Sequence, residues 1–241
     1  MHKLTAEAFA DRLLAHASPD ERDNLQRHFK MAPGTYGEGD MFAGVRMRDV
    51  FALAKEFIDM PAGEIERLLE SPVHEVRAGA LSIMDKAARR KRTPDDRRKD
   101  LFDLYLGRMD RIDNWDLVDL AAPYVVGGYL FDKPRDVLFD LARSSNVWER
   151  RTAMISTLYF ARQGDLDDIY RIAEILLHDD HDLIHKAVGG MLREAGKHDR
   201  PRLLAFLDER AATMPRTMLR YAIEHLDEAQ RAHYRGAGRQ L

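Results

Sequence analysis

The chain has 241 residues, of which 45% are hydrophobic and 33% charged, and its formal net charge at pH 7 is −3. It contains no cysteine, which excludes a disulfide scaffold, a thiol nucleophile and thiolate metal sites and fits a reducing compartment. A chain of this length can bury a substantial core as one large domain or one repeat array, and its small net charge does not by itself indicate a nucleic-acid binder.

Two helices are expected at the start of the chain. Apolar residues recur at helical spacing over 6–14 and over 20–29, and Pro19 follows Ser18 at a position suited to a first helical turn. The N-terminus lacks the uninterrupted apolar run of a signal peptide, and no apolar stretch approaches the roughly 18 residues of a membrane span. We therefore expect a cytoplasmic protein that does not enter the membrane.

A glycine-rich segment, MAPGTYGEGDMFAGVRM, breaks the helical pattern over 31–47. We interpret it as a connecting loop rather than a phosphate cradle, because no strand precedes Gly34, Gly37 and Gly39 and no Gly-Lys-Ser/Thr follows them. Helical periodicity then resumes without any alternating strand pattern. The sequence predicts one all-α domain over 1–241, with N-terminal helices over 1–30, this loop, helical repeats over 48–235 and a tail over 236–241.

Internal similarity is the most informative feature. Five segments align when Ser71, Asp113, Ser145, Asp180 and Met214 are placed in register, and each has a charged residue six positions later: Arg77, Asp119, Arg151, Lys186 and Arg220. These charges are 42, 32, 35 and 34 residues apart, which is typical of paired-helix units such as HEAT repeats. The expected fold is therefore a right-handed superhelical solenoid of HEAT-like helix pairs.

Several of these segments open with helix-start signals. Ser71 precedes Pro72, Asn146 is followed three positions later by Glu149, and Pro215 comes directly after Met214. We expect a helix to begin at each of these places.

The aligned charges predict a basic groove. Equivalent helices of a solenoid line its concave face, so four cations would flank one carboxylate there, with Arg193 and Arg216 adding positive charge. Such a groove suits duplex nucleic acid, whose phosphates Lys and Arg would contact. The alternative is that these charges are solvated surface groups.

The stretch IDNWDLVD places an aromatic ring and a carboxylate four positions apart. A helix that begins at Asp113, with this side chain as its cap, carries Trp115 and Asp119 on one face. A π face beside a carboxylate suits the binding of a cation. The alternative is a core tryptophan next to an unrelated solvated aspartate. Trp148, three positions before Arg151, either packs in the core or walls the groove.

Two other clusters have less specific patterns. The basic residues over 89–92 and 97–99 predict a loop between helices that is either solvated or in contact with a phosphate backbone. The spacing of His178, His181 and His185 allows a metal site if one helix includes all three, but we favour Asp180 as a helix cap and expect no metal. The chain has no GxSxG, Walker A or strand-linked GxGxxG motif, so hydrolase-triad, nucleotidase and dehydrogenase functions are unsupported.

Several separated segments resemble one known family. The segments IDNWDLVDLAAP, SSNVWERRTAMISTLYFARQGD, DLIHKAVGGMLREAGK and MPRTMLRYAIEHL are similar to the DNA alkylation repair family, the AlkD-like HEAT-repeat DNA glycosylases, as is the entry YGEGDMFAGVRM. The resemblance covers residues 31–226. It implies an all-α solenoid that holds duplex DNA on its concave face. It also implies excision of N3- and N7-alkylated purines without a metal or organic cofactor.

The resemblance also implies roles for particular residues. The catalytic aspartate falls on Asp119, its tryptophan partner on Trp115 and the DNA-facing arginine on Arg151. The chain departs from the family at Gly190, in Lys-Ala-Val-Gly-Gly, where the family has a second tryptophan that faces the lesion. Trp148 or Tyr36 are candidates to fill that gap.

The sequence thus predicts a DNA glycosylase of base-excision repair that acts as a monomer on alkylated double-stranded DNA, in the cytoplasm and at the nucleoid. Asp119 and Trp115 are the expected catalytic residues, and the expected DNA contacts are Arg77, Trp148, Arg151, Lys186, Arg193, Arg216 and Arg220. One alternative is a non-catalytic HEAT-repeat binder of damaged or branched DNA, which Gly190 favours. Another is a protein-interaction scaffold, which the aligned charges argue against.

Overall fold

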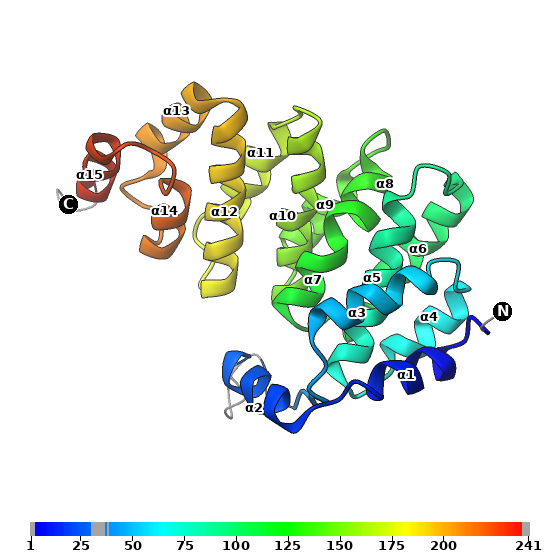
Figure 1. Cartoon of the computed structure of the whole chain (residues 1–241). Coiled ribbons are helices and arrows are strands. Elements are labelled where there is room, and N and C mark those ends of the chain that lie inside the picture. The colour runs from blue at the N-terminus through cyan, green and yellow to red at the C-terminus, as the bar shows by residue number, and fades with distance from the viewer. Residues whose placement is uncertain (1–2, 30–36, 38, 238–241) are drawn as a thin grey trace. The chain divides into compact units, whose positions relative to one another are not determined.

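The computed structural model describes residues 3–29, 37 and 39–237 and shows an all-α protein (Figure 1). Within these residues the only β-structure is an isolated bridge between Met41 and Val73. The predicted fold class is therefore confirmed. No helix in the described part of the chain is long and apolar enough to cross a membrane. Gly34, Tyr36 and the end of the predicted tail lie outside the described residues.

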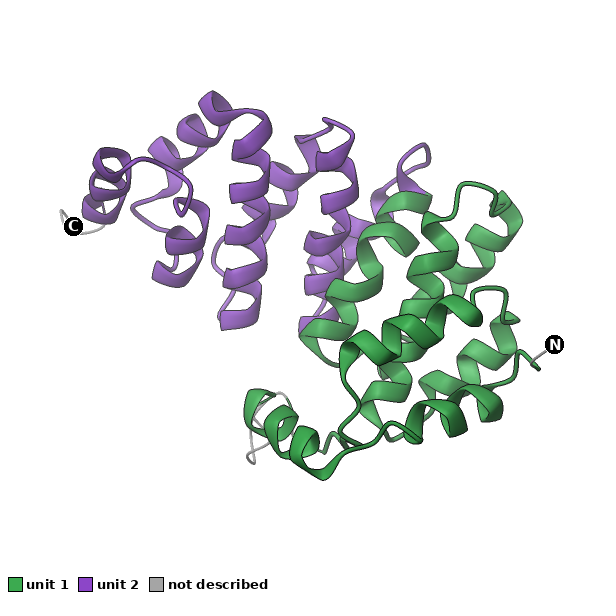
Figure 2. Cartoon of the chain, in the orientation of Figure 1, with its two compact units in different colours: residues 1–129 green, residues 130–241 purple. Residues whose placement is uncertain are grey.

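The helices form two compact units, residues 1–129 and 130–241 (Figure 2). The helices of the first unit are α1 (Ala6–Leu14), α2 (Pro19–His28), α3 (Met47–Glu56), α4 (Ala62–Leu69), α5 (His74–Arg89), α6 (Asp95–Gly107), the 3-10 turn η1 (Met109–Arg111), α7 (Trp115–Ala121) and the π-helical turn η2 (Ala122–Gly127). The short α8 (Gly128–Leu130) lies at the boundary. The helices of the second unit are α9 (Asp136–Ala142), α10 (Val147–Arg162), α11 (Asp167–Ile175), α12 (Asp182–His198), α13 (Arg200–Arg210), α14 (Arg216–Ala222) and α15 (Glu228–Gly236). The single domain predicted from the sequence stays a prediction.

The five aligned charged residues occupy nearly the same position in their helices. The aligned charges are the fifth residues of α7, α10, α12 and α14 and the fourth residue of α5. In the first unit α5 packs against both α3 and α7, and in the second α12 packs against both α10 and α14. Corresponding helices of successive repeats are therefore neighbours within each unit, as stacked helix pairs require.

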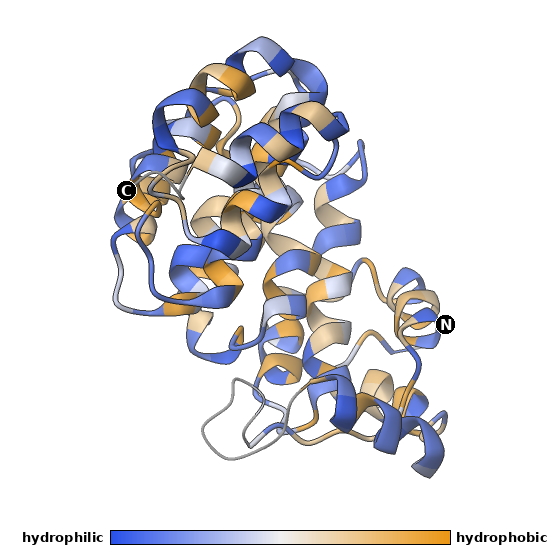
Figure 3. Ribbon diagram, turned by 90° about the vertical axis from the view of Figure 1, so that its left-hand side faces the viewer, coloured by the Kyte–Doolittle hydropathy of each residue, from blue (hydrophilic) through white to orange (hydrophobic). Residues whose placement is uncertain are grey.

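Each unit has its own apolar core, and many helices carry a hydrophobic and a hydrophilic side (Figure 3). In the first unit Phe9 and Phe57 meet edge to face, with ring centroids 5.2 Å apart. In the second unit Gly189 allows a close helix contact, because a Cβ there would lie 2.4 Å from the Met218 carbonyl oxygen and 2.6 Å from the Tyr221 Cβ. A side chain at Gly189 would therefore push α12 and α14 apart.

Several predicted helix starts are confirmed. Helix α1 covers the predicted residues, and α2 begins at Pro19 directly after its N-cap, Ser18. Asn146 caps α10 by accepting a hydrogen bond from the Trp148 backbone N–H at 2.9 Å. Helix α14 begins directly after Pro215.

Two predicted starts are wrong by a few residues. Helix α5 begins at His74 rather than next to Ser71, because the Ser71 hydroxyl accepts from the Val73 N–H at 3.1 Å and holds that turn outside the helix. Helix α12 is capped by His181 rather than Asp180, since the His181 Nδ1 accepts from the Leu183 N–H at 3.2 Å.

Candidate functional site

Helix α7 begins with an asparagine cap. Asn114 Oδ1 accepts from the Trp115 N–H at 2.8 Å, and Asn114 Nδ2 donates to Asp40 at 2.8 Å. The predicted cap, Asp113, instead accepts from Arg77 Nη2 at 3.1 Å. The prediction was wrong because Asp113 has a long-range cationic partner. Asn114 is fully buried, so both of its hydrogen bonds hold the start of α7 in place.

Trp115 and Asp119 are one turn apart on α7, as predicted, and both are half-buried. The Trp115 indole stacks on the buried Phe29 ring, with centroids 5.7 Å apart and 20° between the planes. The exposed His28 ring meets the indole at an angle of 60°, with centroids 6.0 Å apart. His28, at the end of α2, and Phe29, directly after it, thus hold the Trp115 ring on the helix that carries Asp119.

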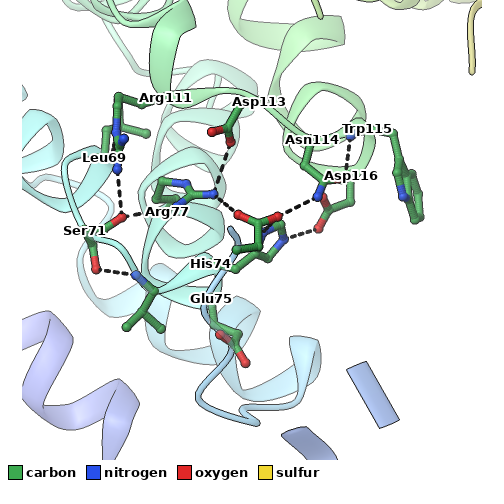
Figure 4. A network of polar contacts seen from close by, with 12 residues as sticks. Leu69, Ser71, His74, Glu75, Arg77, Arg111, Asp113, Asn114, Trp115 and Asp116 are labelled. Atoms are coloured by element: carbon green, nitrogen blue, oxygen red, sulfur yellow. Dashed lines mark hydrogen bonds and ion pairs between the residues drawn. The ribbon is translucent and has the colours of Figure 1, made fainter. Parts of the chain in front are cut away.

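A buried polar network joins α7 to α5 (Figure 4). His74 is 1% exposed, and its Nε2 lies 2.8 Å from Oδ2 of Asp116 in the first turn of α7. Its Nδ1 lies 3.4 Å from Asp40, at which distance the contact is mainly electrostatic. Asp40 also accepts from Arg77 Nη2 at 2.6 Å. Asp40 therefore links the glycine-rich segment to α5 and to the start of α7.

The network shifts the pKa values of its members. Burial lowers the pKa of His74, but the hydrogen bond to Asp116 and the contact with Asp40 outweigh this effect and raise it to about 9. Burial raises the pKa of Asp40, but His74, Arg77 and Asn114 outweigh it and lower the value to about 2. At neutral pH the network therefore contains an imidazolium cation and an ionised Asp40.

The glycine-rich segment wraps around a carboxylate of the protein itself. Glu75, 1% exposed, accepts from the backbone N–H groups of Ala43, Gly44 and Val45 at 3.1, 2.8 and 3.1 Å. Gly44 has a φ of +84°, and a Cβ there would lie 2.0 Å from the Ser18 carbonyl oxygen. Successive backbone N–H groups of this kind attract an anion, and here Glu75 is that anion. The described part of this segment is a connection, as predicted.

Two arginines of the aligned series are buried. Arg77 is 3% exposed, and its guanidinium contacts Asp40 and Asp113, a placement that does not support the predicted contact with DNA. Arg151 is 5% exposed and donates to the Leu183 carbonyl at 2.7 Å, a placement that does not support the predicted contact with DNA. Moving a buried, paired guanidinium to a ligand would leave its partners unsatisfied.

Two other predicted DNA contacts are partly exposed and paired. Lys186 Nζ lies 2.7 Å from Asp182 Oδ2 on the same helix, and the Arg193 guanidinium pairs with Glu224. Such exposed ion pairs are weak, so these cations remain able to exchange their partners for a phosphate. Trp148 is half-buried in the first turn of α10.

Arg216 and Arg220 are the most accessible members of the predicted set. Both are exposed on α14, and neither forms an ion pair with a carboxylate of the described chain. The Arg220 guanidinium lies over the Tyr221 ring, 5.2 Å from its centroid. The cationic surface predicted from the aligned residues is therefore best developed at this end of the second unit.

Several arginines of the basic cluster over 89–99 form contacts within the protein, and only part of the cluster is a loop. Residues 97–99 belong to α6, and Arg98 donates to the carbonyls of Thr93 and Arg90 at 3.1 and 2.9 Å. Arg89 bonds Asp85 at 2.8 Å and lies over the Tyr124 ring, 3.7 Å from its centroid. The cluster thus ties α5, α6 and their neighbours together.

The position of the missing second tryptophan has room for a side chain. Gly190 is buried in α12, yet a Cβ built there would meet no atom within 4 Å. Of these two adjacent glycines, it is therefore Gly189 that makes the close contact with α14.

The histidine cluster around 178–185 is used in local hydrogen bonds. His178 lies outside the helix, His181 caps α12 and the His185 Nε2 contacts the Asp179 carbonyl. No group of three or more His, Asp or Glu side chains in the described chain is arranged to hold a metal ion.

Comparisons with known proteins give a consistent result. A family model described as DNA alkylation repair enzyme matches residues 9–226. A solved structure described as a "Predicted DNA alkylation repair enzyme from Enterococcus faecalis" is similar, with a TM-score of 0.70, 17% sequence identity, and coverage of 88% of this chain and 98% of that one. A likeness at this level of identity shows a shared fold. A search of curated proteins finds no match.

Proposed function

The chain belongs to the DNA alkylation repair enzyme family, and on that premise we propose that it is a DNA glycosylase of base-excision repair. It would hydrolyse the N-glycosidic bond of cationic N3- or N7-alkylated purines in duplex DNA. Family membership supports the role in DNA repair. The observation that carries the finer assignment is on α7, where Asp119 follows Trp115 by one turn and Trp115 stacks on Phe29.

The proposed reaction needs one well-placed carboxylate. A purine alkylated at N3 or N7 is already positively charged, so the bond to C1′ can break with its electron pair leaving on the base, which becomes neutral. The sugar becomes an oxocarbenium-like cation, and a nearby carboxylate stabilises it. Water then adds to C1′ and loses a proton. No strong general acid is required, because alkylation has activated the leaving group.

In this proposal Asp119 stabilises the sugar cation and orients the water, while Trp115 packs against the lesion nucleotide. An indole ring attracts cations through its π face. The stacking contact with Phe29 and the buried network at Asp116 would hold α7 in one position, and a fixed electrostatic environment is what makes such stabilisation effective. Lys186, Arg193, Arg216 and Arg220 would contact phosphates, and the protein would act as a monomer on double-stranded DNA.

The experiment that tests this proposal is base release from duplex DNA treated with a methylating agent. We expect the protein to release 7-methylguanine and 3-methyladenine, identified by chromatography, and to release no base from untreated duplex. Release of no base from either duplex at saturating protein would contradict the proposal.

A second function, non-catalytic binding of damaged or branched DNA, is favoured by Gly190. The family pattern has a tryptophan at this position, and here the space next to the Cα is open. Under this alternative the protein would bind methylated duplex tightly and with strong salt dependence but would leave the bases in place. The Gly190→Trp variant would then show whether the added ring restores base release.

A further inference from the structure

A cavity of about 490 Å³ is lined by residues of α14 and α15 and of the turn after α14. These two helices are neighbours near the C-terminus of the chain (Figure 1). Among the described residues, four arginines line it: Arg216 and Arg220 of α14 and Arg231 and Arg235 of α15. Glu224 is the one acidic residue among these described lining residues. The volume falls in the range of roughly 300–1,000 Å³ that is typical of small-ligand sites. The cavity lies entirely within the second unit.

The two arginines of α14 present accessible cations to this cavity. Arg216 and Arg220 are one turn apart, so their side chains leave the same side of the helix. Arg216 Nη2 donates to the Arg235 carbonyl at 3.2 Å and so connects α14 to α15. Both guanidiniums are without a carboxylate partner in the described chain, and the cavity therefore contains cationic donors that a ligand can use.

The two arginines of α15 share one carboxylate. Glu228 accepts from Arg231 at 2.6 Å and from Arg235 at 3.2 Å, while Glu224 pairs with Arg193. The Arg231 Nε is buried and has no hydrogen-bond partner in the described structure. The described lining of the cavity thus holds four arginines and one glutamate, an excess of three positive charges.

The cavity concentrates more positive charge in one place than single contacts along a nucleic-acid backbone require. Along a duplex each internal phosphodiester carries one negative charge, and cations that follow it are spread out with the phosphates. A phosphomonoester carries nearly two negative charges at pH 7, because its second pKa is about 6. Converging guanidiniums bind such a group through paired, charge-assisted hydrogen bonds.

We propose that the cavity between α14 and α15 binds a phosphomonoester carried by a nucleotide, either the phosphorylated end of a DNA strand or a free mononucleotide. Leu219 and Ile223 add an apolar wall, on which the attached sugar would pack. The site needs no base excision, so this inference goes beyond the proposed glycosylase function and can fail or hold independently of it.

The test uses fluorescence anisotropy with a short duplex that carries a fluorophore at one 3′ end and either a phosphate or a hydroxyl at the 5′ ends. We expect the unaltered protein to bind the 5′-phosphorylated duplex about tenfold more tightly than the 5′-hydroxyl duplex, because one charge-assisted contact is gained. Arg216→Gln and Arg220→Gln should each remove most of this preference.

Arg143→Gln is the matched control. Arg143 is exposed in the same unit, and its guanidinium also donates to a backbone carbonyl, that of Phe139 at 2.8 Å, but it lies outside the cavity. This variant should keep the full preference. Equal affinity for both duplexes in the unaltered protein, or an equal preference in all three variants, would overturn the inference.

Competition identifies the source of the phosphate. Displacement of the phosphorylated duplex by deoxyadenosine monophosphate, but not by deoxyadenosine, would show that a free nucleotide suffices. Displacement only by a phosphorylated oligonucleotide would assign the site to strand ends.

The two proposals can be told apart by their outcomes. A protein that releases methylated bases but has no preference for 5′-phosphate would overturn this inference alone. A preference for 5′-phosphate without any base release would contradict the proposed function alone.

Discussion

His74 on α5 and Asp116 on α7 are joined by a buried contact of 2.8 Å between the imidazole Nε2 and the carboxylate Oδ2. Asp116 directly follows Trp115, so this contact fixes the first turn of the helix that carries the candidate site to α5. On the other side of the imidazole, Asp40 brings in the glycine-rich segment. The position of Trp115 and Asp119 therefore depends on charges that lie in three separate parts of the chain.

Replacing His74 with Gln should destabilise the protein by roughly 3–5 kcal/mol, because removal of one partner from a buried ion pair leaves the other without compensation. Urea unfolding followed by circular dichroism measures this change. His16→Gln, at an exposed position of the same unit, is the control and should change the free energy of unfolding by less than about 0.5 kcal/mol. Equal stability of the two variants would show that the network contributes little.

The stability of the protein should also fall at alkaline pH. The pKa of His74 is raised from its usual 6.5 to about 9, so the stabilisation from its protonation is fully present below pH 6.5 and is lost as the pH rises through 9. A shift of this size corresponds to roughly 3 kcal/mol. Unfolding curves between pH 6 and pH 10 should therefore show a loss in the unaltered protein that His74→Gln lacks. Parallel pH profiles for the two proteins would contradict this assignment.

Much of the fold could be predicted from the sequence because helical periodicity is local. The first helix, the helix start at Pro19 and the cap at Asn146 all follow from short-range patterns. These signals depend on neighbours within one or two turns, which the sequence displays directly.

The surroundings of the candidate site depend on long-range contacts, which periodicity cannot reveal. Arg77 aligns with accessible cations, but its partner Asp40 is 37 residues away in the glycine-rich segment. The stacking of Phe29 on Trp115 likewise joins residues from distant parts of the chain. Arg231 and Arg235 were missed because they follow the last aligned repeat; their i, i+4 spacing after Glu228 was the available signal.

Gly44→Ala should be much more destabilising than Gly39→Ala. Both glycines have positive φ values, +84° and +86°, so each substitution carries a conformational cost of about 1–2 kcal/mol. At Gly44 the new Cβ would also lie 2.0 Å from the Ser18 carbonyl oxygen, whereas at Gly39 it would meet no atom within 4 Å. Urea unfolding of the two variants separates the steric effect from the backbone effect. Equal losses would mean that the backbone relaxes around the added methyl group.

The neighbouring glycines of α12 should respond oppositely to alanine. Gly190→Ala has open space and gains helix propensity, so it should stabilise the protein by roughly 0.5–1 kcal/mol. Gly189→Ala would press against α14 and should destabilise it by roughly 1–3 kcal/mol. Thermal unfolding measures both changes. A destabilised Gly190→Ala variant would show that the space at this position is needed by the fold.

The central claim is that Asp119 stabilises the transition state for loss of a cationic purine. The most direct measurement is single-turnover release of 7-methylguanine and 3-methyladenine from methylated duplex DNA by the unaltered protein and by Asp119→Asn, with the affinity for duplex DNA measured in parallel. We predict that the variant releases base at least about 100-fold more slowly, as expected for loss of a main electrostatic group, and that it binds DNA with unchanged affinity. Equal rates of release by the two proteins, or a loss of release that is matched by an equal loss of DNA binding, would contradict the role assigned to Asp119.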